Sequence, residues 1–200
     1  MTPAEHGGDK GEARRRQILE AAIRCFRKNG FHAASMSSLA KEAGMSVGHI
    51  YHYFENKEAI IAAFVEEKLE SFHDLMNRLR ETGAPLADAM VADAVHGFDD
   101  MCDPDNAALF LEITAEAARN PAIGAAVRDV DRKIRSAFSD FLAESCGCGE
   151  NGDRAALNGR IEMIAAVYEG LTIRAIRHPD LDREATLEAL RLVISRLMSP

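Results

Sequence analysis

The chain has 200 residues, of which 47% are hydrophobic and 28% are charged, so it can bury a substantial core and stay in solution. This composition excludes a disordered chain and a fibre. The apolar runs are too short to cross a bilayer, and the N-terminus lacks the apolar segment of a secretory signal. We therefore expect a soluble, cytoplasmic protein.

The net charge of −8 is unevenly distributed along the chain. Residues 1–60 contain nine basic and seven acidic residues, whereas the other 140 contain 15 basic and 25 acidic residues. A mildly basic N-terminal part on an acidic remainder is expected where only the first part meets phosphate.

The four cysteines do not predict a disulfide framework in a chain of this length. Cys146 and Cys148 are separated by one glycine, whereas zinc sites usually combine Cys-x-x-Cys with a second ligand pair. We interpret them as two thiols in a glycine-rich turn, and a redox role for the pair stays open. No metal site and no cofactor are predicted.

Apolar residues recur with helical spacing along most of the chain and no alternating strand pattern is present, so we predict an all-α protein. Residues 1–12 are polar and glycine-rich, which favours a disordered tail. Ser35, Ser46 and Asn56 are expected to cap the second, third and fourth helices. The four helices are expected at 13–29, 36–43, 47–54 and 57–82.

Five more helices are expected after Pro85, near 86–101, 106–120, 123–145, 153–178 and 182–197. The helix from Asp153 has two apolar faces, which predicts burial on two sides. We expect its second face and the last helix to build a two-fold homodimer. The residues predicted at that interface are Leu187, Leu190, Ile194 and Leu197.

Residues 35–58 have the organisation of a helix-turn-helix, with a short helix, a tight turn at Gly44 and a capped second helix. Such a second helix fits the major groove of DNA, with its N-terminal side chains at the base edges. Helix N-termini also favour phosphate. The residues predicted to contact DNA are Ser35, Ser37, Ser46, Val47, Gly48, His49, Tyr51, His52 and Lys57.

Several of these residues have a plain structural alternative. Tyr51 would otherwise pack within the head, and His49 and His52 would otherwise be solvated surface histidines. Lys57 is either a phosphate anchor or a surface lysine, and Tyr53 fits either the core or a backbone contact. The run Arg14–Arg16 fits phosphate or the minor groove, or a solvated start of a helix.

Residues 13–65 resemble the DNA-binding head of the TetR family of bacterial transcriptional regulators. The matching residues are Ile18–Ala22, Phe26, Gly30-Phe31, Leu39-Ala40, Ala43–Ser46, Gly48, Ile50-Tyr51, Phe54 and Lys57-Glu58. The resemblance implies an all-helical dimer, a reader of a palindromic operator and a variable C-terminal small-molecule domain. Val47 stands where many members carry a basic or polar residue, so an apolar contact to a thymine methyl is the substitute there.

On this basis the chain divides into a tail (1–12), a helix-turn-helix domain (13–58), a connecting helix (59–83) and a helical effector-binding and dimerisation domain (84–200). Effector pockets are mainly apolar with a few polar groups, although core packing is the better explanation of each apolar candidate. A surface salt bridge with Arg119, three residues later, is the alternative for Glu116. The stretch 110–121 also resembles the C-terminal region of a betaine-regulator-like subgroup. The predicted pocket residues are Phe98, Met101, Phe110, Glu112, Ile113, Glu116, Met163 and Tyr168.

These patterns lead to a ligand-responsive repressor as the first hypothesis, released from a palindromic operator by a small molecule. The alternative is an effector-free DNA-binding protein of the same fold, acting as an architectural or partner-bound regulator. An enzyme is not predicted, because the chain contains no nucleophile elbow, His-rich metal motif or phosphate loop.

Overall fold

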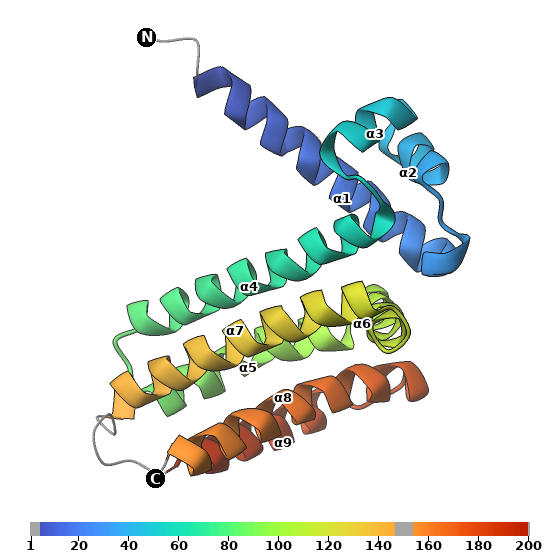
Figure 1. Cartoon of the computed structure of the whole chain (residues 1–200). Helices are drawn as coiled ribbons and strands as arrows, with labels where there is room; N and C mark the ends of the chain where they lie inside the picture. Colours follow the sequence, from blue (N-terminus) through green and yellow to red (C-terminus); the bar gives the residue numbers. More distant parts are fainter. Residues whose placement is uncertain (1–4, 147–153, 200) are drawn as a thin grey trace. The chain divides into compact units, whose positions relative to one another are not determined.

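The computed structural model describes residues 5–146 and 154–199, which form helices and no strand (Figure 1). The all-α prediction is confirmed, and the predicted bounds of α4 to α9 lie within three residues of those observed. Over the same residues, no helix is both long and apolar enough to cross a membrane. The helices are α1 (Glu5–Ala33), α2 (Met36–Ala43), α3 (Val47–Tyr53), α4 (Lys57–Glu81), α5 (Leu86–Cys102), α6 (Pro104–Ala117), α7 (Pro121–Cys146), α8 (Arg154–Arg177) and α9 (Arg183–Met198).

Helix α1 begins at Glu5, so the prediction of a disordered tail is wrong for residues 5–12, while residues 1–4 lie outside the described residues. Once a helix is nucleated, each added residue costs little, and the nucleus around the buried Ile18 extends toward the N-terminus. The predicted stop is present, because Gly30 has φ 75° and ψ 160° and breaks the helix before its last turn.

The predicted caps of the helix-turn-helix are confirmed. The Ser35 hydroxyl accepts a hydrogen bond from the Ser38 amide, and Gly44 ends α2 in the left-handed conformation with φ 65°. The Ser46 hydroxyl accepts from the His49 amide at 3.2 Å, and the Asn56 side chain accepts from the Ala59 amide at 2.7 Å. Local hydrogen bonds therefore set the starts of α2, α3 and α4.

The chain forms two compact units, the first of residues 1–67 and 109–128 and the second of residues 68–108 and 129–200. This division differs from the predicted domains, because 109–128 joins the helix-turn-helix and not the rest of the C-terminal part. The chain crosses from one unit to the other inside α4, α6 and α7. The fully buried large side chains of the first unit include Ile18, Leu19, Phe31, Leu39, Ile50, Ile60, Ile61 and Ile123.

The second unit has one core, to which α4, α5, α7, α8 and α9 contribute. Leu187, Leu190 and Ile194 are buried in this core, at 2–6% exposure, and Leu197 packs against it. The prediction that Leu187, Leu190 and Ile194 face a partner is therefore wrong, because they pack α9 against its own chain. Leu197 is half-buried, so its contact with a partner stays a prediction. Helix α9 instead exposes Leu192 (68%) and Val193.

Helix α8 does have two apolar faces, as the sequence indicates. Leu157, Ile161 and Ile164 belong to the core of the second unit or pack against it. On the opposite side, Met163 is 54% exposed and Ile173 is 38% exposed. One apolar face of α8 is thus left uncovered by the described residues of this chain.

Candidate nucleic-acid interface

Helix α3 buries one side and presents the other to solvent. Ile50 is fully buried and Phe54, at the C-terminal cap, is nearly so. Tyr51 is 53% exposed and Val47 is 37% exposed. Gly48, His49 and His52 are exposed as well. All five α3 residues predicted at DNA therefore share the solvent side of the helix.

Tyr53 packs against both histidines of this surface. Its ring centroid lies 5.4 Å from that of His49 and 5.2 Å from that of His52, the second pair edge to face. Tyr53 is itself half-buried. These two ring contacts lie within α3, and they restrict the orientations of the two imidazole rings.

The serines of the site are exposed, but two of them already cap helices. Ser35 and Ser46 each accept a backbone amide through their hydroxyl oxygen, and the Ser35 hydroxyl also donates to the Ser38 hydroxyl oxygen at 3.4 Å. Ser37 is exposed on the first turn of α2. The position of α2 on α1 is fixed by the Gln17 amide, which donates to the Ala43 carbonyl at 2.9 Å, among other contacts.

Lys57 does not point into solvent as a phosphate anchor would. Its Nζ donates to the carbonyl oxygens of Phe31 at 2.7 Å and Ala34 at 3.0 Å. It also lies 4.2 Å from the centre of the Phe31 ring, a cation–π contact. Lys57 therefore ties the start of α4 to residues 31–34 at the end of α1, and its contact with phosphate stays a prediction.

The three arginines near the start of α1 each have a partner within the first unit. The Arg14 guanidinium donates to the Gln17 side chain at 2.7 Å, and Arg16 pairs with Glu20 at 3.4 Å. Arg15 lies 5.4 Å from the centre of the Phe54 ring. Arg15 is thus half-buried and differs from the solvated alternative, whereas Arg14 and Arg16 are exposed.

The predicted effector residues are divided between the two units. Phe110, Glu112, Ile113 and Glu116 belong to the first unit, whereas Phe98, Met101, Met163 and Tyr168 belong to the second. The Glu112 carboxylate accepts the Phe31 amide, and the buried Glu116 carboxylate pairs with His32 and Arg119. Both acids thus have partners within this chain, and the pair with Arg119 is the alternative that the sequence offers for Glu116. A role for either acid at an effector stays a prediction.

The remaining aromatic and sulfur candidates mostly pack between helices of the second unit. Phe98 is only 2% exposed, and Thr172 donates to the Met101 sulfur at 3.5 Å. Burial, with the nearby Asp93 charge, raises the pKa of Tyr168 to about 12. The core-packing alternative therefore accounts for Phe98, Met101 and Tyr168.

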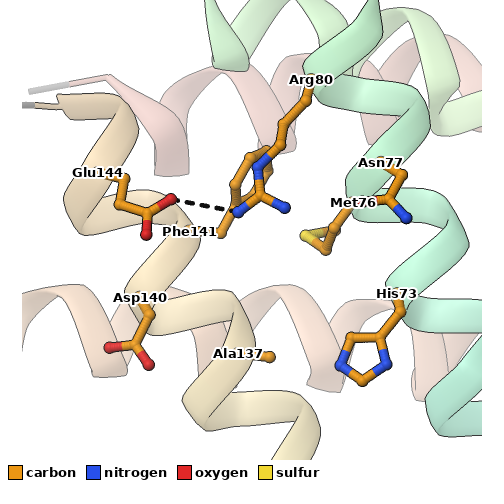
Figure 2. A pocket seen from close by; sticks show the side chains of 8 residues that line it. All are labelled: His73, Met76, Asn77, Arg80, Ala137, Asp140, Phe141 and Glu144. Carbon is orange, nitrogen blue, oxygen red and sulfur yellow. Dashed lines mark hydrogen bonds and ion pairs between the residues drawn. The ribbon is translucent and has the colours of Figure 1, made fainter.

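A cleft of about 380 Å³ lies elsewhere in the second unit, between α4 and α7 (Figure 2). The Arg80 guanidinium lies 4.7 Å from the centre of the Phe141 ring and pairs with Glu144 at 3.2 Å. Sequence reasoning missed this cleft, although its residues recur at the same helical spacing on both helices. The lining residues are His73, Met76, Asn77, Arg80, Ala137, Asp140, Phe141 and Glu144.

Comparison with known proteins identifies the chain's family. A family of bacterial regulatory proteins, the tetR family, matches residues 18–64, and the C-terminal domain of BetI-type transcriptional repressors matches residues 83–199. The HTH-type transcriptional regulator UidR of Escherichia coli K12 is 30% identical over 191 residues, covering 92% of this chain and 93% of UidR. The chain belongs to the TetR family.

Solved structures of TetR-family regulators have the same fold. Salmonella enterica GusR superposes with a TM-score of 0.71 at 28% identity, over 93% of this chain and 95% of GusR. FadR of Bacillus subtilis, solved in complex with stearoyl-CoA, superposes with a TM-score of 0.71 at 23% identity, over 90% of this chain and 97% of FadR. The protein is a DNA-binding transcriptional regulator with a helix-turn-helix head, and not an enzyme.

The contacts of Lys57 give it a testable structural role in this TetR-family head. Replacing Lys57 by Met removes two hydrogen bonds to carbonyl oxygens, so we expect the free energy of unfolding to fall by about 1.5–3 kcal/mol without any DNA present. Urea denaturation measures this, with Lys41→Met on the exposed side of α2 as the matched control. Equal free energies of unfolding for the two variants would show that the hydrogen bonds of Lys57 do not stabilise the head.

Proposed function

We propose that the protein is a dimeric repressor that reads a palindromic operator through α3 and leaves it when a small molecule binds the second unit. The observation that carries the DNA part is the solvent side of α3, where polar and aromatic side chains gather on a helix anchored by Ile50 and Phe54. A helix held in this way can enter the major groove without disturbing the fold. Because bacterial DNA lies in the cytoplasm, we place the protein there.

Within this proposal the predicted residues contact different parts of the DNA. The Tyr51 hydroxyl and the serine hydroxyls contact phosphate, which positions the head on DNA. His49 and His52 read base edges, and Val47 contacts a thymine methyl group. The ring contacts of Tyr53 support this assignment for the histidines, because restricted rings lose less freedom on binding.

The uncovered apolar surface of α8 and α9 supports the dimer. Met163 and Ile173 on α8 and Leu192 and Val193 on α9 are large apolar side chains left exposed by one chain. Helices α8 and α9 contact each other within the second unit, so their exposed apolar residues can both contribute to an isologous four-helix contact. A dimer is also needed to set two recognition helices about 34–36 Å apart on a palindrome.

The cleft between α4 and α7 is our candidate for the effector site. Its volume of about 380 Å³ lies within the range of about 300–1,000 Å³ for small-molecule pockets. Met76 and Phe141 provide apolar surface, and Arg80, Asp140 and Glu144 provide charge. The stearoyl-CoA complex of Bacillus subtilis FadR supports small-molecule binding on this fold.

For DNA binding, we expect the full-length protein to select one palindromic duplex family from a random pool. Tyr51→Phe should weaken binding to every sequence about equally, since a phosphate contact carries no base information, whereas His49→Ala should change the preferred bases. Fluorescence anisotropy on selected and scrambled duplexes measures both effects. If neither variant changes affinity or preference at moderate salt, the solvent side of α3 is not the DNA surface.

For the dimer, Leu192→Glu should give a folded monomer at micromolar concentration, because a charge would enter the partner contact and not the core. Ile194→Glu two residues away should instead destabilise the fold by more than about 3 kcal/mol, because it buries an unpaired charge. Sedimentation velocity and thermal melts distinguish the two outcomes. A Leu192→Glu variant that stays dimeric would exclude this surface as the interface.

For the effector, we expect a compound that raises the melting temperature and weakens operator binding by about 5–150-fold. Ala137→Trp, which fills the cleft, should abolish both effects while leaving DNA affinity without the compound unchanged. A thermal-shift screen followed by anisotropy measures this. If no compound changes operator affinity, the effector-free regulator becomes the better description.

A further inference from the structure

Two carboxylates of α6 lie against residues 30–35, the segment that follows the break at Gly30 and leads into α2. This segment is called the turn between α1 and α2 below. The Oε1 atom of Glu112 accepts a hydrogen bond from the Phe31 amide at 2.5 Å. One helical turn later, Glu116 is only 3% exposed, and its Oε2 lies 3.0 Å from Nε2 of His32. Helix α6 therefore contacts two consecutive residues of this turn, from a position more than 80 residues further along the chain.

The backbone of the turn is shaped to admit the Glu112 carboxylate. Gly30 adopts φ +75°, and a Cβ atom built on it would lie 3.3 Å from Glu112 Oε1. The carboxylate also lies near the end of α1, where the helix dipole disfavours negative charge. Its presence there is therefore not explained by the dipole, and it requires a specific partner, which the Phe31 amide provides.

The Phe31 backbone is held from both sides. Its N–H donates to Glu112 of α6, and its carbonyl oxygen accepts from Lys57 at the start of α4. Lys57 also donates to the Ala34 carbonyl, and the next residue, Ser35, caps α2. Hydrogen bonds thus connect Glu112 of α6 with the Phe31 peptide group, and Lys57 with both Phe31 and Ala34, the residue before the α2 cap.

We propose that Glu112 is a positioning residue for DNA binding, which fixes the turn between α1 and α2 and so sets the orientation of the helix-turn-helix. Glu116 secures the same contact through His32. This proposal rests on the DNA surface assigned above to α3, but it concerns a side chain outside that surface.

The test compares Glu112→Gln with Glu112→Leu in the full-length protein. Both variants remove one negative charge and keep a similar side-chain size, but only Gln can still accept the Phe31 amide. Loss of one acidic charge should by itself favour binding to phosphate. We expect Glu112→Gln to bind the duplex selected by the wild-type protein at least as well as wild type, and Glu112→Leu to bind about tenfold more weakly than Glu112→Gln.

Hydrogen exchange and the salt dependence of binding separate positioning from simple loss of fold. Thermal melts first establish that both variants are more than about 95% folded at the assay temperature. The backbone amides of residues 31–35 should then exchange faster than in wild type in Glu112→Leu, but not in Glu112→Gln. The slope of affinity against salt should stay that of wild type, since Glu112 touches no phosphate.

Equal DNA affinities for the Gln and Leu variants would overturn the proposal, as would a Leu defect no larger than its unfolded fraction. If Glu112→Leu does not fold, Glu112→Ala replaces it in the same comparison with Gln. Failure of the wild-type protein to select any duplex would instead count against the proposed function, so the two failures are distinguishable.

Discussion

The peptide group of Phe31 is the point on which the arrangement of the DNA-binding head depends. Its N–H is bonded by Glu112 and its carbonyl by Lys57, while its ring is fully buried in the first unit. Buried or partly buried peptide groups must find partners, and here both partners are charged side chains. The turn that presents α2 and α3 is thus held by groups from α4 and α6, and not by its own sequence alone.

This arrangement explains why part of the C-terminal half groups with the head. Residues 109–128 form one compact unit with residues 1–67, and the buried Ile123 adds apolar contact to the polar contacts of Glu112 and Glu116. Three helices, α4, α6 and α7, pass between the units without a break.

The second unit shows how one apolar pattern can serve two purposes. Helices α8 and α9 cover the core with Ile161, Ile164, Leu190 and Ile194, and still leave Met163 and Leu192 in solvent. Exposed apolar surface of this kind is unfavourable for a monomer and favourable for a protein that pairs with a second copy. The cleft between α4 and α7 is separate from this surface in its lining residues, so pairing and effector binding need not compete.

Local features of this protein were determined by its sequence. The helices from α4 onward, the caps at Ser35, Ser46 and Asn56, and the break at Gly30 follow from periodicity and from hydrogen bonds within a few residues. The family resemblance of the head rests on the same local spacing, and the solvent side of α3 agrees with it.

The tertiary structure decided which surfaces those helices cover. An apolar stripe on α9 shows that Leu190 and Ile194 are buried, but not whether a partner or the same chain buries them. In the same way, the sequence places Glu112 and Glu116 on one helix face, whereas only the fold brings them to Phe31 and His32. Lys57 likewise finds its carbonyl partners 23 and 26 residues away. Helical periodicity reports that a face is covered, and only long-range packing selects what covers it.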